Sequence, residues 1–301
     1  MAMTRSGILL IDKPEGPSSA QVVSRVKRLL GAKKVGHLGT LDPFASGLLL
    51  VGVNEGTKIA DIFLGGSKTY CGTIMLGVDT DTQDSTGKVT NSRPVPPLGE
   101  IELRALEEKF SGELLQTPPM FSALKKDGVR LYQLARQGKE VPREPRNIRI
   151  EQLQLRGKTN TEIEISVTCS RGTYIRTLAA DIGADIGCGA HLQSLRRTAC
   201  GSLAIDQAWT LDALEKQCAN VAVPLLPLAE ALVHLRAVQW PSRLLSRLRL
   251  GQQEILGQID PAQPGERLVR VLNPRGELAA LAEWTEDLAG GHWRLQRVFQ
   301  E

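Results

Sequence analysis

Residues 36–53 read GHLGTLDPFASGLLLVGV, and this stretch decides how the rest of the chain is interpreted. Its one carboxylate, Asp42, precedes a proline, and Asp-Pro in a glycine-rich segment is typical of a tight turn. The apolar run from Leu48 to Val53 is typical of a buried strand. A loop carboxylate next to a buried strand is also where a rigid scaffold presents reactive groups. The sequence alone therefore allows Asp42 to be a turn residue or a chemical group.

Helices and strands mix irregularly on both sides of this stretch. Because they follow no strict βαβ rhythm, we expect an α+β fold with a largely antiparallel sheet. The segment 79–100 is rich in Asp, Thr, Ser, Gly and Pro and is expected to be a surface loop. The pattern predicts strands at 7–11, 48–53, 68–78, 148–155 and 162–169, and helices at 17–31, 57–64, 101–110 and 174–187.

The composition of the chain changes near residues 233–242. The last 60 or so residues contain the short apolar runs LVRVLN, LAALAEW and HWRLQRVF, separated by glycine and proline turns. Such spacing predicts a small β-rich second domain. We therefore expect two domains, residues 1–235 and residues 242–301.

Overall composition is that of a globular protein, with 42% apolar and 23% charged residues in 301. The five cysteines form no C-x-x-C pair and the four histidines have no metal-ligand spacing. We therefore expect reduced thiols, no metal site and a cytoplasmic location. No segment approaches the ~20 apolar residues that cross a membrane, so no membrane partner is expected.

Positive charge is unevenly distributed, although the net charge is only +4. Residues 125–149 hold eight Lys or Arg against three Asp or Glu, and residues 1–40 hold seven against two. Further basic residues are Arg196, Arg197, Arg243, Arg247 and Arg249. One such cluster is usually a solvated surface. Several in one chain favour contact with an RNA backbone.

A cation that could serve Asp42 lies in CSRGTYIRTLAADIG, residues 169–183. A single carboxylate suits nucleophilic catalysis better than paired acid-base work, and it needs a nearby cation to stay ionised when desolvated. Arg176 falls in the first turn of the predicted helix, where the helix dipole disfavours its charge. It is either an exposed arginine over apolar neighbours or the partner of Asp42.

Tyr70 and Tyr174 are two of only three tyrosines. A tyrosine at the edge of a strand or helix is usually half-buried packing. The functional alternative is a stacking surface for a base extracted from its helix.

Six motifs resemble the TruB family of tRNA pseudouridine synthases, and the match to this family runs in order from about Ile8 to Thr198. They are GHLGTLDPFASGLL, SKTY (67–70), PPMFSALK (118–125), LYQLARQG (131–138), RGTYIRTLAADIG (171–183) and GCGAHLQSLRRT (187–198). The last 60 residues resemble a PUA domain, an RNA-binding β-barrel.

The resemblance implies a pseudouridine-synthase fold, in which a mainly antiparallel sheet is flanked by helices and followed by a PUA-like barrel. It implies isomerisation of the T-loop uridine at tRNA position 55, without a metal, an organic cofactor or a guide RNA. The partner would be the tRNA T-arm, and we expect a monomer. The basic segment 118–146 would be the family's RNA-clasping insertion.

The resemblance also implies roles for single residues. Asp42 would be the nucleophile, attacking either the uracil ring or the ribose anomeric carbon, and Arg176 would pair with it. The other residues would hold the target: Tyr70 by stacking and by assisting proton removal, Tyr174 and Leu195 by lining the uracil pocket, His37 by filling space left by flipped bases, and Lys13, next to Pro14, by supporting the active-site loop.

Three positions depart from the commoner family pattern: Leu38 replaces Thr, Phe44 replaces Leu and Leu50 replaces Pro. None of them replaces a chemical group named above, so they concern the packing of the loop. Two other functions remain open from the sequence. One is a non-catalytic chaperone that binds and folds tRNA, and the other is the same chemistry on another structured RNA. Only an enzyme requires Asp42 as a carboxylate.

Overall fold

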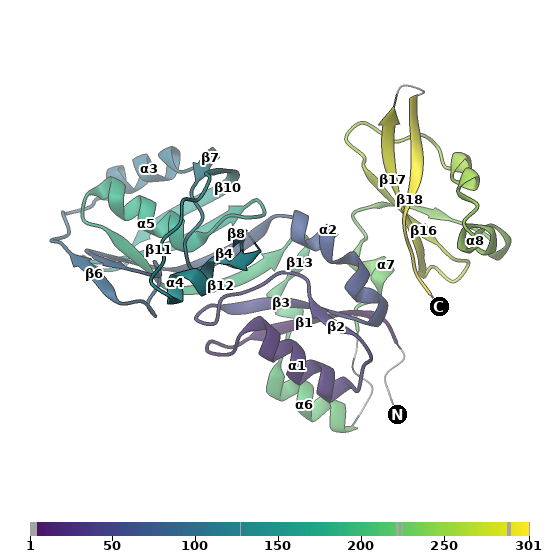
Figure 1. Cartoon of the computed structure of the whole chain (residues 1–301), viewed down its shortest axis with the longest axis horizontal. Coiled ribbons are helices and arrows are strands. Elements are labelled where there is room, and N and C mark those ends of the chain that lie inside the picture. The colour runs from purple at the N-terminus through teal and green to yellow at the C-terminus, as the bar shows by residue number, and fades with distance from the viewer. Residues whose placement is uncertain (1–4, 127, 221–222, 224, 288–289, 301) are drawn as a thin grey trace.

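The computed structural model describes residues 5–126, 128–220, 223, 225–287 and 290–300. Figure 1 shows a large sheet through most of the molecule and a separate small sheet near the C-terminus. The large sheet consists of β1 (Gly7–Lys13), β2 (Val35–His37), β3 (Ser46–Val53), β4 (Lys68–Leu76), β7 (Gly112–Gln116), β10 (Arg146–Gly157), β11 (Glu162–Cys169), β12 (Ala190–Cys200), β13 (Leu203–Ala204) and β14 (Trp209–Thr210).

The strand order in this sheet is β14-β1-β3-β12-β4-β11-β10-β7, with β2 paired to β3 and β13 to β12. Within the described residues, all pairs are antiparallel except β1–β14 and β3–β12. The expected α+β class with a mainly antiparallel sheet is thus confirmed.

The helices lie near the positions expected from the sequence. α1 (Ser19–Leu30) begins with a capping box between Ser18 and Gln21, and it ends at Gly31 in the left-handed conformation. The remaining helices are η1 (Asn54–Ile59), α2 (Ala60–Gly65), α3 (Glu100–Lys109), α4 (Leu131–Arg136), α5 (Ile175–Ile186), η2 (Ile205–Gln207), α6 (Leu211–Asn220), α7 (Leu228–Ala231), α8 (Ser242–Arg249) and η3 (Gln253–Gln258). No helix among the described residues is long and apolar enough to cross a membrane.

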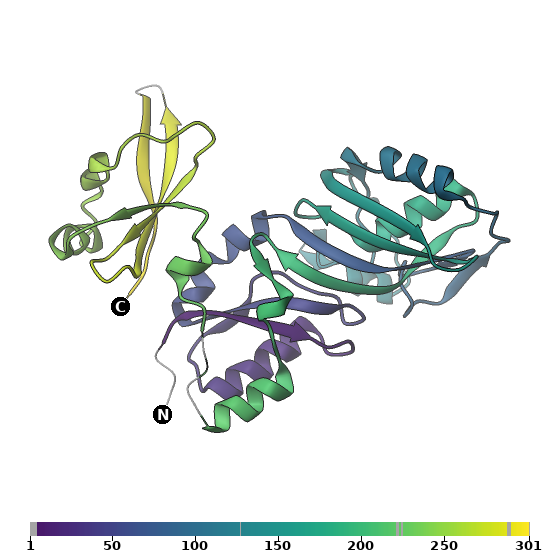
Figure 2. The ribbon, with the colours of Figure 1, turned by 180° about the vertical axis from the view of Figure 1, so that it is seen from behind.

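β3 is apolar on both faces because both of its faces are covered. Leu49 and Val51 join the core cluster that includes α1, α5 and α6, whereas Leu48 and Leu50 join the cluster that includes α2 and α7. Figures 1 and 2 show α1 and α6 side by side against the first of these faces. An apolar run without alternation is what a doubly covered strand requires. The strand that follows Asp42 is therefore fixed from both sides.

The other half of the sheet is covered on one face only. In β11, Ile163, Ile165 and Val167 are buried against α3 and α5, and the residues between them are polar. This explains the two-residue alternation in the sequence. The polar face stays open to solvent.

The C-terminal sheet has the order β15-β16-β17-β18. Its strands are β15 (Arg236–Gln239), β16 (Leu268–Leu272), β17 (Leu278–Asp287) and β18 (Gly290–Val298). It has its own apolar core, which includes Trp240, Trp293 and two leucines of α8. The small β-rich unit expected near the end of the chain is present, in line with a PUA-like fold. The domain limits 1–235 and 242–301 stay a prediction, and β15 lies between them.

One expectation about the fold was wrong. The segment 79–100 is not simply a surface loop, because β5 (Val78–Thr80) pairs with β6 (Val89–Ser92). The polar residues Thr80 and Asp84 are also buried. Ser85 and Leu192 join this segment to β12 through a hydrogen bond of 3.1 Å. Asp and Thr favour turns, but here they also satisfy buried partners. A second small hairpin is formed by β8 (Lys125–Lys126) and β9 (Val129–Arg130).

Candidate active site

Asp42 lies in a tight turn between β2 and β3. The amide of Ala45 donates to the carbonyl of Asp42 at 3.1 Å, which closes the turn around Pro43. The Ser19 hydroxyl at the start of α1 donates to the Leu41 carbonyl at 2.9 Å and accepts from the Leu41 amide at the same distance. Asp42 is thus a turn residue, and the turn fixes the direction of its carboxylate.

Lys13 holds this turn through a hydrogen bond to its backbone. It is completely buried at the end of β1, and its ammonium donates to the carbonyls of Pro14 at 2.8 Å, Pro17 at 2.9 Å and Pro43 at 3.3 Å. Burial lowers the pKa of Lys13 to about 8, and the nearby Asp42 charge opposes that shift. The contact with Pro43 gives the expected support of the Asp42 loop a physical basis, and the contacts with Pro14 and Pro17 hold the segment between β1 and α1 to the same ammonium.

Arg176 meets Asp42 directly. The Nε of Arg176 lies 3.0 Å from Oδ2 of Asp42, and the arginine side chain is only 5% exposed. Its other nitrogens donate to the carbonyl of Thr82 at 2.9 Å and the carbonyl of Phe121 at 2.8 Å. The structure thus brings together the two residues that the sequence analysis paired.

A second carboxylate, Asp84, shares Arg176 and was not found from the sequence. Its Oδ2 lies 3.3 Å from Nη1 of Arg176, and its side chain is 6% exposed. Its Oδ1 accepts from the hydroxyls of Thr82 and Thr86 and from the Thr86 amide. A loop aspartate followed by threonines is typical of a turn, so its pattern gave no signal. Its role becomes visible only in the structure, where it satisfies part of the buried Arg176 side chain.

The segment that carries Asp84 is held in an unusual conformation. Gln83 has φ +61°, in the left-handed region that non-glycine residues rarely adopt. Its side-chain oxygen accepts from the Thr177 hydroxyl at 2.8 Å and its carbonyl accepts from the Leu192 amide at 3.0 Å. Contacts to α5 and β12 therefore hold this segment against Arg176.

The charges around Asp42 act in opposite directions on its pKa. Although 41% of its side chain is accessible, the surrounding protein displaces water, and this desolvation raises the pKa of Asp42. Arg176 and Lys13 lower it, whereas Asp84 raises it, and the net direction is upward. Arg176 therefore favours the ionised carboxylate against the effect of desolvation.

Tyr174 lies beside this group at the start of α5. The Gln116 side chain fixes the Tyr174 backbone twice. The Tyr174 backbone amide donates to Gln116 Oε1 at 2.8 Å, and Gln116 Nε2 donates to the Tyr174 carbonyl at 3.1 Å. Burial raises the pKa of the Tyr174 phenol, and the charges of Asp42 and Arg176 also act on it. The half-buried ring thus borders the ion pair.

Tyr70 and His37 lie around another buried cation, Arg197. Tyr70 is half-buried on β4 opposite Arg197 of β12, and burial raises the pKa of its phenol to about 12. Burial and the charge of Arg197 lower the pKa of His37, whose Nδ1 is buried without a hydrogen-bond partner. At neutral pH both rings are therefore uncharged, as a stacking surface for a base should be.

The expectation that Arg197 contributes to an RNA footprint was wrong. Its side chain is 2% exposed and donates to the carbonyls of Leu48, Thr40 and Gly39 at 2.8, 3.3 and 3.1 Å. Gly47 has φ +102°, and a Cβ there would lie 2.3 Å from the carbonyl oxygen of Arg197. β12 therefore presses closely against the loop that carries Asp42, and Arg197 holds that loop. The neighbouring Arg196 forms an ion pair with Asp12 at 2.8 Å.

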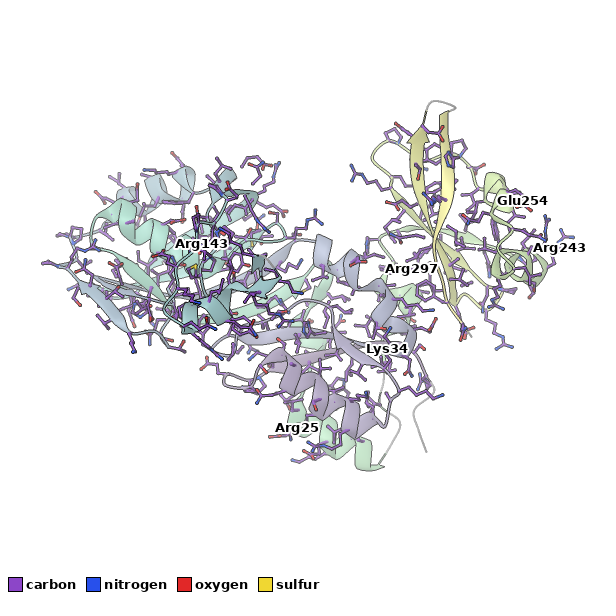
Figure 3. The ribbon with its side chains drawn as sticks, viewed as in Figure 1. Arg25, Lys34, Arg143, Arg243, Glu254 and Arg297 are labelled. Carbon is purple, nitrogen blue, oxygen red and sulfur yellow. The ribbon has the colours of Figure 1, made fainter. Side chains whose placement is uncertain are left out.

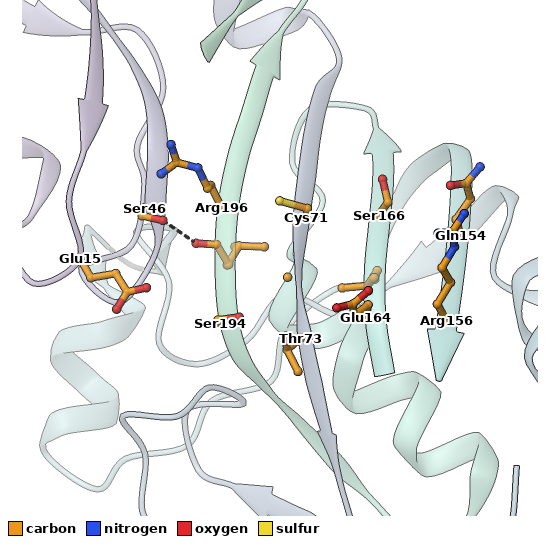
Figure 4. Close-up of a pocket in the computed structure, with 13 residues that line it drawn as sticks. Glu15, Ser46, Cys71, Thr73, Gln154, Arg156, Glu164, Ser166, Ser194 and Arg196 are labelled. Atoms are coloured by element: carbon orange, nitrogen blue, oxygen red, sulfur yellow. Dashed lines mark hydrogen bonds between the residues drawn. The ribbon is translucent and has the colours of Figure 1, made fainter. Parts of the chain in front are cut away.

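Leu195 lies on β12, nearly buried, and its carbonyl accepts a 3.5 Å hydrogen bond from Ser46. It also borders a groove of about 580 Å³ on the polar side of the sheet, which Figure 4 shows in close-up. Cys71, Thr73 and Glu164 line this groove, on strands whose alternate residues enter the core. Asp42, Tyr70 and Arg176 are not among its lining residues, so this groove is not the site assembled above.

A second groove of about 580 Å³ lies between β18 and residues Lys34 and 57–61 of the N-terminal part of the chain. Its lining includes Lys34, Lys58, Asp61 and Arg297, two of which Figure 3 labels. Lys58 donates to the Val298 carbonyl at 3.1 Å and pairs with Glu55 at 2.6 Å, so it joins the two parts. Among the described residues, no group of three or more His, Cys, Asp or Glu is arranged to hold a metal ion. The five cysteines are free.

Two adjacent segments of the chain match known families. Residues 27–175 match the N-terminal domain of the TruB family pseudouridylate synthases, and residues 176–233 match the C-terminal domain of tRNA pseudouridylate synthase B. tRNA pseudouridine synthase B of Syntrophobacter fumaroxidans is 41% identical, with 98% of each chain covered. The protein of that name from Geobacter sulfurreducens is 42% identical over 97% of this chain and 99% of its own.

Solved structures with the same fold include the Cbf5-Nop10-Gar1 complex, with a TM-score of 0.74 at 25% identity over 98% of this chain and 85% of that chain. The archaeal box H/ACA sRNP Nop10-Cbf5 complex gives a TM-score of 0.70 at 23% identity over 98% of this chain and 86% of that chain. These neighbours share the arrangement of strands and helices of this chain.

The shared arginine makes a prediction about stability. Arg176→Ala leaves Asp84 buried without its cation, so the free energy of unfolding should fall by about 3–5 kcal/mol. Asp84→Asn should lower it less, and the double variant should lose less than the sum because both residues belong to one network. Denaturant unfolding followed by circular dichroism measures all three.

Arg25→Ala is the matched control, because Arg25 pairs with the exposed carboxylates of Asp212 and Glu215 at 3.2 and 2.6 Å. Such a pair contributes little, since water screens it. An Arg176→Ala loss no greater than that of the control would contradict a buried network.

Proposed function

The chain belongs to the TruB family of pseudouridylate synthases and is a tRNA pseudouridine synthase; we propose that Asp42 is its nucleophile and that a T-loop uridine is its target. The observation that carries the proposal is the 3.0 Å contact between the Asp42 carboxylate and buried Arg176. A carboxylate aimed by a turn and held by a fixed cation meets the needs of a nucleophile.

The chemistry isomerises the nucleoside without a net change in composition. The Asp42 carboxylate attacks C6 of the uracil or C1′ of the ribose, and both paths remain open. The bond between N1 and C1′ breaks, the uracil turns, and C5 forms a new bond to C1′. The proton on C5 then leaves, N1 gains a proton, and the Asp42 carboxylate is released unchanged. No oxidant or reductant is needed.

The target base must leave its stack to reach Asp42. The uncharged ring of Tyr70 is proposed to stack on the extruded uracil, with Tyr174 and Leu195 lining its pocket. His37, held neutral by burial and Arg197, is proposed to fill space among the flipped T-loop bases. The pKa of the Tyr70 phenol is raised to about 12, so little phenolate is present near neutral pH. The Tyr70 phenolate is therefore a poor candidate for the base that removes the C5 proton. Stacking is therefore its better supported role.

We assign the T-arm of tRNA as the partner, bound by a monomer in the cytoplasm without a guide RNA. The basic segment 118–146 is proposed to clasp the arm. We propose a further contact with the RNA backbone at the groove beside β18. Lys34, in this groove, lies three residues before His37, roughly 10 Å along an extended strand, so an RNA that reaches His37 also reaches the groove. Within the described residues, neither Lys34 nor Arg297 has an ion-pair partner. Two free cations in one groove suit the phosphates of a bound RNA.

Asp42→Asn tests the nucleophile. The amide keeps the shape of the carboxylate but cannot attack, so pseudouridine formation in a bare tRNA transcript should fall below detection while binding is kept. Carbodiimide labelling of pseudouridine and a filter-binding assay measure the two quantities. Asp12→Asn serves as the control, because Asp12 pairs with Arg196 and not with Arg176.

The same measurement separates the rival functions. Normal product from Asp42→Asn would end the nucleophile assignment. Wild-type protein that binds and refolds tRNA without forming pseudouridine would favour the chaperone. Product on another structured RNA but none on the bare tRNA transcript would overturn the assigned substrate.

Arg176→Lys tests how Asp42 stays ionised. A lysine ammonium cannot reproduce the fork that contacts Asp42, Asp84 and Phe121 together, so the lowering effect on the pKa of Asp42 weakens. Because the active form is the carboxylate, activity is lost as pH falls through this pKa. The acid limb of kcat/KM against pH should therefore move to higher pH, and an unmoved limb would contradict the coupling.

The groove beside β18 makes a prediction about salt. The double variant Lys34→Glu, Arg297→Glu should bind full-length tRNA about tenfold or more weakly. Its slope of log affinity against log salt should be shallower by roughly 1.5, because two phosphate contacts are lost. Arg104→Glu is the control, on α3 far from the small sheet in Figure 1. A slope equal to that of wild type would remove the groove from the RNA surface.

A further inference from the structure

The large sheet has a short junction between β3 and β12. These two strands pair in parallel along two consecutive residues of each, Ser46 with Arg196 and Gly47 with Arg197. On one side of the junction lie β14, β1, β2 and β3, and on the other side lie β12, β4, β11, β10 and β7. β12 and β4, by contrast, pair along most of their length. The sheet thus consists of two well-paired parts that meet at a narrow junction.

The residues of the candidate active site are divided between these two parts. His37 ends β2, and Asp42 lies in the loop that leads from β2 into β3. Tyr70 lies on β4, and Tyr174 and Arg176 lie at the start of α5, which precedes β12. A target base held between Tyr70 and Asp42 therefore spans the junction, and its fit depends on how far apart the two parts are held.

The side chain of Arg197 crosses this junction. Its terminal nitrogens donate to the carbonyls of Gly39 and Thr40, which precede Asp42, and its Nε donates to the carbonyl of Leu48, which follows Asp42. One guanidinium from β12 therefore binds both ends of the loop that carries the nucleophile. Its donors form a rigid planar fork, so it fixes the directions of these carbonyls as well as their distances.

Arg197 also lies in one cross-strand row with Gly47 and Tyr70. Its register partner in β3 is Gly47, and its register partner in β4 is Tyr70. A Cβ at Gly47 would lie 2.3 Å from the carbonyl oxygen of Arg197 and 2.7 Å from its backbone nitrogen, so the glycine permits this close approach. Two strand spacings, roughly 10 Å, therefore separate the backbones of Gly47 and Tyr70.

We propose that Arg197 is a positioning residue that sets the spacing between the Asp42 loop and the ring of Tyr70, and so the width of the gap that receives the target base. This inference rests on the proposed function, in which Asp42 attacks the nucleoside and Tyr70 stacks on the extruded uracil. Arg176 contacts the Asp42 carboxylate itself, whereas Arg197 fixes the backbone from which that carboxylate projects. At 2% exposure, Arg197 acts through these contacts rather than by touching the nucleoside.

Arg197→Lys tests the proposal by a comparison of kcat with tRNA affinity. The ammonium keeps the charge, but it cannot reproduce a fork that reaches both ends of the loop. With a tRNA transcript, kcat should fall roughly ten- to hundredfold, because a displacement near 1 Å at the reacting groups costs about that much. The Kd for tRNA, measured by filter binding, should stay unchanged, because the buried side chain offers no surface to the RNA.

Arg270→Lys is the matched control. Arg270 of β16 also donates to three carbonyls, those of Leu235 at 2.9 Å, Val233 at 3.5 Å and Ala229, but it does so in the C-terminal part of the chain. This variant should also lower the free energy of unfolding, and it should keep wild-type kcat. A kcat loss in Arg197→Lys no larger than that in Arg270→Lys would overturn the proposal.

Gly47→Ala reaches the same junction from β3 and leaves Arg197 in place. Its Cβ must push β12 away from the loop, so kcat should again fall while the Kd is kept. Circular dichroism gives the folded fraction of each variant, and kcat is referred to that fraction. A Gly47→Ala enzyme with wild-type kcat would contradict a spacing set at this junction.

A double-mutant cycle on kcat tests the link to Tyr70. Tyr70→Leu removes the stacking ring, and it should cost less in the Arg197→Lys background than in wild type, because the ring is already misplaced there. Losses that multiply would overturn the link.

Wild type and Asp42→Asn are measured in parallel. No pseudouridine from wild type, or product from Asp42→Asn, shows failure of the proposed function. An active wild type and an inactive Asp42→Asn, together with an Arg197→Lys enzyme of wild-type kcat or a cycle without coupling, show failure of the Arg197 proposal alone.

Discussion

The site depends on one guanidinium that binds three other segments of the chain. Arg176 contacts Asp42 of the β2–β3 loop, Thr82 and Asp84 of the β5–β6 hairpin, and the carbonyl of Phe121. An arginine 5% exposed cannot lose its charge, so its donors must be satisfied where they are. The partners are therefore obligatory, and this requirement places the Asp42 turn and the segment that carries Phe121 relative to each other.

Three buried cations hold the loop that carries Asp42. Lys13 donates to the carbonyl of Pro43, Arg197 donates to the carbonyls of Gly39 and Thr40, and Arg176 contacts the carboxylate itself. Lys13 and Arg197 donate to backbone oxygens of the described residues, so they fix the loop while Arg176 contacts the Asp42 carboxylate. Such preorganised charges also favour an anion at this place. The Asp42 carboxylate benefits from that field.

The sequence predicted the parts of the site whose signals are local. The Asp-Pro turn, the apolar run of β3 and the two-residue alternation of β11 identify their structures without reference to the rest of the chain. Asp84 and the burial of Arg197 could not be predicted, because both depend on which distant segments meet. Asp84 resembles any loop aspartate, and Arg197 resembles half of a basic surface pair, until β12 is seen beside β3. The domain limits and the catalytic roles carried over from the family remain predictions.

The claim that Arg176 divides its charge between Asp42 and Asp84 is tested most directly by the carboxyl carbon chemical shift of Asp42, followed by NMR against pH in wild type and in Asp84→Asn. The account predicts a wild-type midpoint above the ordinary range of an aspartate, because desolvation and Asp84 raise the pKa of Asp42. It predicts a lower midpoint in Asp84→Asn, where Arg176 has one anion left to balance. A wild-type midpoint at or below the ordinary range, unchanged by Asp84→Asn, would contradict the account.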